Sequence, residues 1–233
     1  MGSLLQKFLP CPIETASNDK ETLDLIPRVD VLMIGVPIQD TLEILEKIAP
    51  LMREDQLLLD ITSLKMAPCA AMLKAKCSVI GMHPLFGPSI DTLQGKHLAF
   101  CPVRPGPWKE IVLSWFQGAE IIETTPEHHD EMMAMTQALV HFINMAFITL
   151  LKEKMPLKEL SPFATPTYDM QLNLARRILS GSPALYASIQ RENSFFPAIL
   201  DHLEQVIADL KKLVLQPDST EFHKKFEELS TYV

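Results

Sequence analysis

Basic residues and cysteines are scarce in the sequence, and both scarcities limit what the protein is expected to bind. It has 21 Lys and Arg against 29 Asp and Glu, a formal net charge of -8 at pH 7. Nucleic acids and anionic membranes attract clustered Lys and Arg, so neither is the expected partner. The four cysteines form no C-x-x-C pair. We therefore expect reduced thiols, neither disulfides nor a metal site, and a cytoplasmic location.

Long apolar runs and targeting segments are also missing. The longest apolar run near the middle, "ALVHFINMAFITLL" (138–151), is shorter than the roughly 20 residues that a membrane span needs, so we expect a buried helix. The N-terminal "MGSLLQKFLPCP" has no basic residue before its apolar part, which argues against a signal peptide. The composition, 47% hydrophobic and 21% charged, is that of a globular chain with one or two domains.

The hydrophobic pattern divides the chain near residue 125. Before it, near-continuous apolar runs alternate with helical ones, which is typical of parallel strands covered on both faces. The expected strands are residues 29–37, 56–62, 77–83, 97–103 and 119–125. The expected helices beyond it are residues 126–153, 164–180, 183–192, 194–215 and 218–231. The predicted fold is α/β followed by all-α, with a Rossmann-like domain over 1–125 and a helical domain over 126–233.

Polar residues follow two of the expected strands. "IGMHPLFGPSIDTLQGKHLAF" (80–100) places His83 at a strand end, and "LLLDITSLK" places Ser63 and Lys65 just after Asp60. Ligands of open α/β sheets bind at the carboxyl ends of strands, so we expect Ser63 and His83 to face one cleft. A turn with an incidental histidine and a helix cap at Ser63 are the alternative interpretations.

The expected helix over 126–153 has a polar face. Spacings of four, three and four place the following residues on it: Asp130, Ala134, Gln137 and His141. The adjacent His128 and His129 point in different directions on a helix, so they are a weak metal candidate and we expect a solvated helix start.

Two adjacent arginines lie in an otherwise apolar helix, "QLNLARRILSG". At least one of Arg176 and Arg177 should be exposed. The other is a candidate to hold a carboxylate with two parallel hydrogen bonds.

These motifs occur in a definite order: "VDVLMIGVPIQDTLEIL", "LLLDITSLK", "IGMHPLFGPS", "EHHDEMMAMTQALVHF" and "SPFATPTYDMQLNLARRILSGSPALYASI". In that order and spacing they resemble the prephenate dehydrogenase family of tyrosine biosynthesis, over nearly the whole chain. The combination of D-x-x-S-x-K, H-P-x-F-G-P and Q-A-L-x-H-F is far more specific than any one of them. The resemblance is closest to the bacterial type that is often fused to a chorismate mutase, and no mutase segment is present here.

The resemblance implies roles for individual residues. The family oxidises prephenate with NAD or NADP, releasing carbon dioxide and 4-hydroxyphenylpyruvate; arogenate is the alternative substrate. By this resemblance His83 is the general base for the ring hydroxyl, and Ser63 hydrogen-bonds that hydroxyl and orients His83. Lys65 would bias the site toward anions. Substrate binding would fall to Arg177, on a substrate carboxylate, and to the pocket helix with Gln137 and His141.

Cofactor contacts are implied at Val36, Pro37 and Ser63 on the nicotinamide side, and at Gly2. A dinucleotide-binding domain should open with a strand, then G-x-G-x-x-G, then a helix. Here "MGSLLQKFL" resembles only the last Met-Gly and the helix, and no G-x-G occurs anywhere. The expectation is an N-terminally truncated Rossmann-like domain with weakened binding of NAD or NADP.

The missing strand would leave an apolar edge beside residues 29–37. The segment around residues 12–15, a strand from another subunit, or sequence upstream are three ways to cover it. Glu14 and Asp19 are candidates for the acid that binds the ribose.

Three hypotheses about function follow. The first is an active dehydrogenase, homodimeric through the helical domain. The second is a remnant that binds the substrate but holds the cofactor poorly. The third is a helical homodimer that serves as an interaction module, with "MMAMTQ" (132–137) and the exposed arginine on its surface.

Overall fold

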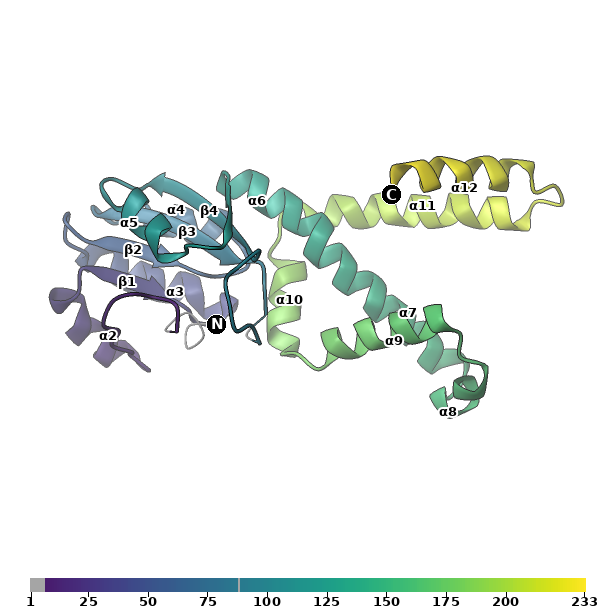
Figure 1. Ribbon diagram of the computed structural model, residues 1–233, viewed down its shortest axis with the longest axis horizontal. Helices are drawn as coiled ribbons and strands as arrows, with labels where there is room; N and C mark the ends of the chain where they lie inside the picture. The colour runs from purple at the N-terminus through teal and green to yellow at the C-terminus, as the bar shows by residue number, and fades with distance from the viewer. Residues whose placement is uncertain (1–6, 88) are drawn as a thin grey trace.

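The computed structural model describes residues 7–87 and 89–233, and its first half is built around a five-stranded sheet (Figure 1). The strands follow chain order across the sheet. They are β1 (Val31–Ile34), β2 (Leu57–Asp60), β3 (Ser78–Pro84), β4 (His97–Arg104) and β5 (Glu120–Glu123). All five predicted strands are confirmed.

The strand directions differ in one place from the prediction. β1, β2 and β3 are parallel, and β5 is parallel to β4, but β4 runs antiparallel to β3. A parallel crossover needs an intervening helix, and residues 85–96 between β3 and β4 contain none among those described. The expectation of parallel strands throughout was therefore wrong at β4.

Helices cover both faces of the sheet (Figure 1). On one face α3 (Ile38–Ile48) and α4 (Met66–Met72) contribute Leu45, Ile48 and Met72 to a buried cluster with Leu58 and Val79. On the other, α5 (Trp108–Trp115) supplies the buried Val112. The short α2 (Asp19–Leu25) precedes β1.

β1 lies at the edge of the sheet, where β2 is its only neighbour among the described strands. Its side chains from Val31 to Met33 are half-buried, unlike those of the enclosed β2. Phe8 and Leu9 pack beside Val31 and Met33 in the cluster under α5. The apolar edge expected beside β1 is therefore partly covered on one face.

The helical half begins with one long continuous helix. It comprises α6 (Pro126–Met133), a π-helical segment (Ala134–Leu139) and α7 (Val140–Lys154). The later helices are α8 (Leu157–Leu160), α9 (Pro166–Leu179), α10 (Pro183–Arg191), α11 (Phe196–Leu215) and α12 (Thr220–Tyr232). The predicted helices are confirmed.

The prediction of a buried helix for residues 138–151 was wrong. The continuous helix over Pro126–Lys154 has 29 residues, enough by length and composition to cross a membrane, and only 17% of its most apolar window is buried. Apolar side chains of α7 such as Ile143 and Leu150 are exposed. The apolar run covers only residues 138–151, whereas the helix that contains it begins at Pro126 and ends at Lys154.

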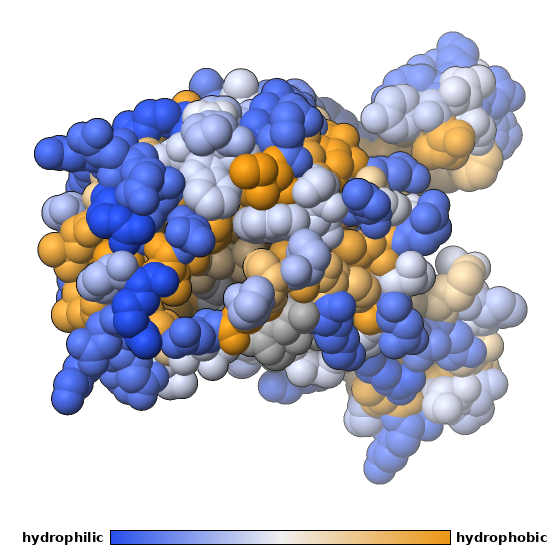
Figure 2. All heavy atoms as spheres, turned by 60° about the vertical axis from the view of Figure 1, so that its left-hand side comes forward, coloured by the Kyte–Doolittle hydropathy of each residue, from blue (hydrophilic) through white to orange (hydrophobic). Residues whose placement is uncertain are grey.

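A third apolar cluster joins the two halves. Ile38 at the start of α3 and Leu64 after β2 pack with Ala134 and Ala138 of the π-helical segment and with Phe196 of α11. In Figure 2 the sheet domain faces the viewer, and the helical part extends behind it as two separate lobes. The junction therefore fixes the long helix against the carboxyl ends of β1 and β2.

Candidate functional site

Four of the predicted residues lie at the carboxyl ends of the parallel strands. Because β1, β2 and β3 are parallel, their carboxyl ends meet there. The half-buried Val36 and exposed Pro37 follow β1, and the half-buried Ser63 follows β2. Asp60 pairs with Gly81 in the register, so His83, two residues further along β3, lies beside the segment that includes Ser63. The structure therefore brings the predicted strand-end residues to one edge.

His83 is held by a histidine from the helical half. Its side chain is 5% exposed, and its Nδ1 atom is 3.0 Å from Nε2 of His129 in α6. The two rings meet edge to face, with centroids 5.2 Å apart. The prediction of a solvated helix start was wrong for His129, which is 2% exposed, although the neighbouring His128 is exposed and contacts Glu131.

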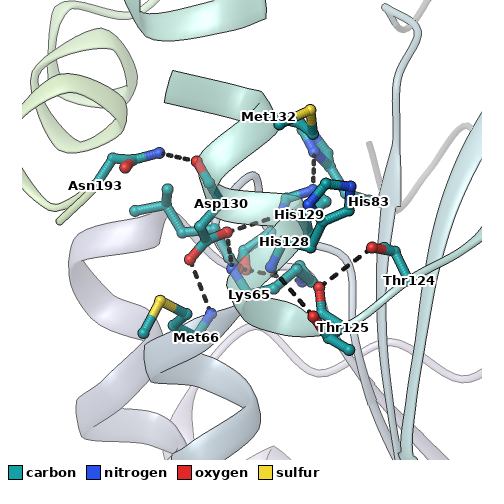
Figure 3. Close-up of polar contacts among 12 residues, drawn as sticks. Lys65, Met66, His83, Thr124, Thr125, His128, His129, Asp130, Met132 and Asn193 are labelled. Atoms are coloured by element: carbon teal, nitrogen blue, oxygen red, sulfur yellow. Dashed lines mark hydrogen bonds and ion pairs between the residues drawn. The ribbon is translucent and has the colours of Figure 1, made fainter. Parts of the chain in front are cut away.

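Asp130 continues this chain of hydrogen bonds and connects it to the sheet domain (Figure 3). Its Oδ1 atom is 2.7 Å from Nδ1 of His129 and accepts the Lys65 backbone N–H at 2.8 Å. Its Oδ2 atom accepts the Met66 N–H at 2.9 Å, at the start of α4. The Asn193 side chain donates to the Asp130 carbonyl at 2.7 Å. Asp130 is therefore fixed from three elements.

The environment of His83 favours its neutral form. Burial lowers its pKa well below the ordinary 6.5, and the nearby His129 and Lys65 lower it further. No described residue hydrogen-bonds its Nε2 atom. A neutral imidazole with one unused nitrogen at the edge of a sheet is suited to accept a proton near neutral pH.

Lys65 does not lie where the sequence interpretation expected it. Its side chain is fully buried, and its ammonium pairs with Asp60, which is also fully buried, and lies 3.3 Å from Oγ1 of Thr62. Because this ammonium and its partners Asp60 and Thr62 are all buried, it does not reach the surface at which a ligand would bind. Direct attraction of an anion by Lys65 is therefore not supported, and its role is within the interior beneath the site.

Two predicted residues on the long helix have unused polar atoms. Neither Oε1 of Gln137 nor Nδ1 of His141 makes a hydrogen bond with the described residues, although both atoms are buried. The His141 ring packs edge to face on Tyr186 of α10, with centroids 4.5 Å apart, and burial lowers its pKa. Gln137 lies in the π-helical segment, a distortion frequent at functional sites. Unused buried polar atoms are what a polar ligand would satisfy.

The two arginines of α9 are both exposed. Arg176 donates to Oδ1 of Asn173 at 3.2 Å, whereas the Arg177 guanidinium makes no hydrogen bond or ion pair with the described residues. Gly2 lies outside the described residues. Within 7–87 and 89–233, no group of three or more His, Cys, Asp or Glu side chains is arranged to hold a metal ion.

Two open hollows on the described surface lie elsewhere, one at residues 148–157 and one beside Trp115, and neither includes a predicted site residue.

Sequence interpretation missed the contact between His83 and the His129–Asp130 pair. The spacing analysis placed Asp130 on the same helix face as Gln137 and His141, which was a usable signal. His129 gave none, because its partner is 46 residues away and belongs to the other domain.

Two family models match consecutive parts of the chain. Residues 11–120 match "Prephenate dehydrogenase, nucleotide-binding domain", and residues 125–228 match "Prephenate dehydrogenase, dimerization domain". Together they include nearly the whole chain.

Relatives give the same result. The chain is 32% identical to the "Probable arogenate/prephenate dehydrogenase" of Methanocaldococcus jannaschii, over 94% of this chain and 51% of that protein. It is 31% identical to the "4-amino-4-deoxyprephenate dehydrogenase" of Streptomyces pristinaespiralis, over 90% of this chain and 72% of that protein. Thus it spans about half the length of the first of these relatives.

The fold has solved counterparts. The crystal structure of prephenate dehydrogenase from Aquifex aeolicus, in complex with hydroxyphenyl propionate and NAD+, matches 93% of this chain and 79% of its own chain with a TM-score of 0.77. The two sequences are 19% identical, so this likeness concerns the fold.

Proposed function

Since this chain belongs to the prephenate dehydrogenase family, we propose that it catalyses the oxidative decarboxylation of prephenate, or of its close analogue arogenate, in tyrosine biosynthesis. The supporting observation is His83, held neutral at the sheet edge with Nε2 unused. In the reaction the substrate loses a hydride and carbon dioxide, and its ring becomes aromatic. When bound, a nicotinamide supplies the acceptor for the hydride.

Residues of this chain accept and hold the proton of the ring hydroxyl. His83 Nε2 accepts it from the ring hydroxyl while hydride leaves the carbon that bears this hydroxyl, so no high-energy oxocation forms. Ser63, after β2, orients the hydroxyl from the neighbouring position. Decarboxylation then needs no further base: the electrons of the broken carbon–carboxylate bond pass through the ring to the oxygen, which takes the proton back from His83 Nε2 to give the phenol.

The described residues suit the nicotinamide half of the cofactor but not its pyrophosphate. Val36, Pro37 and Ser63 offer an apolar and hydroxyl-bearing edge beside His83, which suits a nicotinamide ring. A pyrophosphate cradle of glycine-rich turn and helix N-terminus is not formed by residues 7–87. We therefore expect NAD or NADP to bind this 233-residue chain weakly.

Substrate binding is assigned to the helical half. Gln137 and His141 present unused polar atoms, and the free Arg177 guanidinium suits a substrate carboxylate. The proposed division is a nucleotide-binding part over 1–125 and a dimerisation and substrate part over 126–233, in a cytoplasmic homodimer. The exposed apolar side chains of α7 and α11 are the surfaces that a second copy would cover.

The direct test is absorbance at 340 nm as the purified chain is mixed with prephenate or arogenate and NAD or NADP. We expect turnover with at least one pair, lost in His83→Asn. Ligand binding by calorimetry without turnover under all four conditions would support the binding-only remnant. A stable helical dimer that bound neither ligand would support the interaction module.

A further inference from the structure

We infer that His129 and Asp130 are positioning residues that hold His83 as the tautomer protonated at Nδ1, leaving the Nε2 lone pair for the substrate. The catalytic part of this inference rests on the proposed function. The tautomer is a property of the folded chain and is measurable without turnover.

The hydrogen-bond chain determines where each proton lies. The Asp130 carboxylate is an acceptor, already bonded to two backbone N–H groups, so the His129 Nδ1 atom facing it at 2.7 Å must be protonated. Nε2 of a neutral His129 then has no proton and can only accept. His83 Nδ1, 3.0 Å away, must donate, which leaves Nε2 of His83 as the acceptor.

The rigidity of Asp130 makes this arrangement stable. Rotating its carboxylate away would leave the Lys65 and Met66 amides without partners in the interior, and unpaired buried N–H groups are costly. Asn193, in the loop between α10 and α11, holds the backbone of the same residue. The histidine chain is therefore fixed to α4 on one side and to the helical half on the other.

The charged groups packed around His83 come from both halves of the chain. Lys65 lies beneath the site, Asp60 neutralises it, and Asp130 faces the far side of His129. A proton on His129 would turn its Nε2 into a donor, force His83 Nδ1 to accept, and thereby place the proton of a neutral His83 on Nε2. His83 would then have no free lone pair for the substrate, so the proposed role needs both rings in these tautomers.

Two substitutions at position 129 separate positioning from packing. His129→Leu removes the acceptor for His83, and we expect kcat to fall by about 10–100-fold with KM changed less than about threefold. His129→Gln retains an acceptor toward His83 and a donor toward Asp130 in one amide that does not titrate. We expect it to restore kcat to within a few-fold.

The matched control is His128→Leu, because His128 is adjacent but exposed, and among the described residues its ring pairs with Glu131 alone. It should leave kcat and the pH profile unchanged. If both variants at position 129 lowered kcat equally, and in proportion to the loss of folded protein, then His129 would act by packing. That result would overturn the positioning role.

The tautomer is tested in the unsubstituted protein by two-bond ¹H–¹⁵N correlation spectra of the histidine rings near pH 7.5, with His83→Asn used for assignment. We expect His83 and His129 both protonated at Nδ1. A proton on Nε2 of His83 would overturn the inference even if the protein is active. Absence of turnover together with the Nδ1 tautomer would instead refute the proposed function and leave the positioning intact.

Discussion

At the residue scale, the burial of His83 is what makes its side chain suited to act as a base. An exposed histidine is about half protonated near pH 6.5, whereas burial, with smaller effects of the neighbouring His129 and Lys65, lowers the pKa of this ring and keeps it neutral at lower pH. Neutrality leaves one nitrogen able to accept a proton. The bond from His83 to His129 decides which nitrogen that is.

Replacement of His83 by asparagine tests the base directly. Asn keeps a polar amide near the same place but does not accept a proton near neutral pH, so we expect kcat to fall by on the order of a hundredfold or more. The Michaelis constant should change much less, because substrate contacts on the helical half remain. Steady-state kinetics measure both, and near-normal turnover would remove His83 from this role.

The same burial predicts that the protein loses stability in mild acid. Unfolded His83 takes up a proton below about pH 6.5, whereas the folded ring, with its lowered pKa, does not. The stability it contributes is present above that pH and is lost as the pH falls below it, by at most about 1.4 kcal/mol per pH unit. Urea denaturation between pH 7.5 and 5 should show this slope, and His83→Asn should reduce it. An unchanged slope in the variant would assign the acid sensitivity to other groups.

The adjacent arginines of α9 give a matched pair of variants. Arg177 has no protein partner among the described residues, whereas Arg176 contacts Asn173. Arg177→Ala should raise KM by roughly tenfold or more with a smaller effect on kcat, because a carboxylate contact made in both ground and transition states sets binding. Arg176→Ala should change KM and kcat little. The reverse outcome in substrate titrations would move the assignment to Arg176.

At the element scale, the packing of β3 against α4 depends on the lack of a side chain at Gly81. A Cβ atom there would lie 2.5 Å from Cys69 Sγ, 3.2 Å from Lys65 Cδ and 3.3 Å from Asp60 Oδ1. All three neighbours are buried, and two of them form the interior ion pair. The strand can therefore cover that pair closely only with glycine at this position.

We expect Gly81→Ala to destabilise the fold by about 1–3 kcal/mol through overpacking. The control is Gly87→Ala, since an added Cβ at Gly87 meets nothing within 4 Å. Urea midpoints of the two variants should differ clearly. Equal midpoints would mean that Cys69 and Lys65 shift easily, and that the ion pair is less tightly enclosed than its burial indicates.

Element positions were predictable from local patterns, and contacts between elements were less so. Apolar runs marked all five strands, because this signal acts over a few residues. The reversal at β4 and the partner of His129 depend on where distant segments meet. Lys65 was misjudged for the same reason: a lysine after a strand is usually solvated, and only the tertiary fold places Asp60 against it.

At the scale of the whole molecule, the helical half has more apolar surface than one chain covers. α11 and α12 form a hairpin that extends away from the sheet domain, and α7 and α9 form a second projection (Figure 1). On α11 the exposed apolar residues include Val206, Ile207, Leu210 and Val214. Exposed apolar area of this kind, on a segment that matches a dimerization-domain model, favours association with a second copy.

We expect the purified chain to sediment as a dimer of about twice its 26.2 kDa mass at micromolar concentration. Ile207→Asp places a charge on the exposed stripe of α11, where Ile207 is 57% exposed, and should shift the protein toward monomer by at least about tenfold in the dissociation constant. Leu23→Asp on α2 is the control, because Leu23 is 45% exposed but belongs to the sheet domain. A change in the sedimentation profile with Leu23→Asp and none with Ile207→Asp would place the interface outside the helical hairpin. Loss of prephenate turnover in the monomeric variant, with the circular dichroism spectrum unchanged, would further indicate that the open edge at His83 is completed by the second copy.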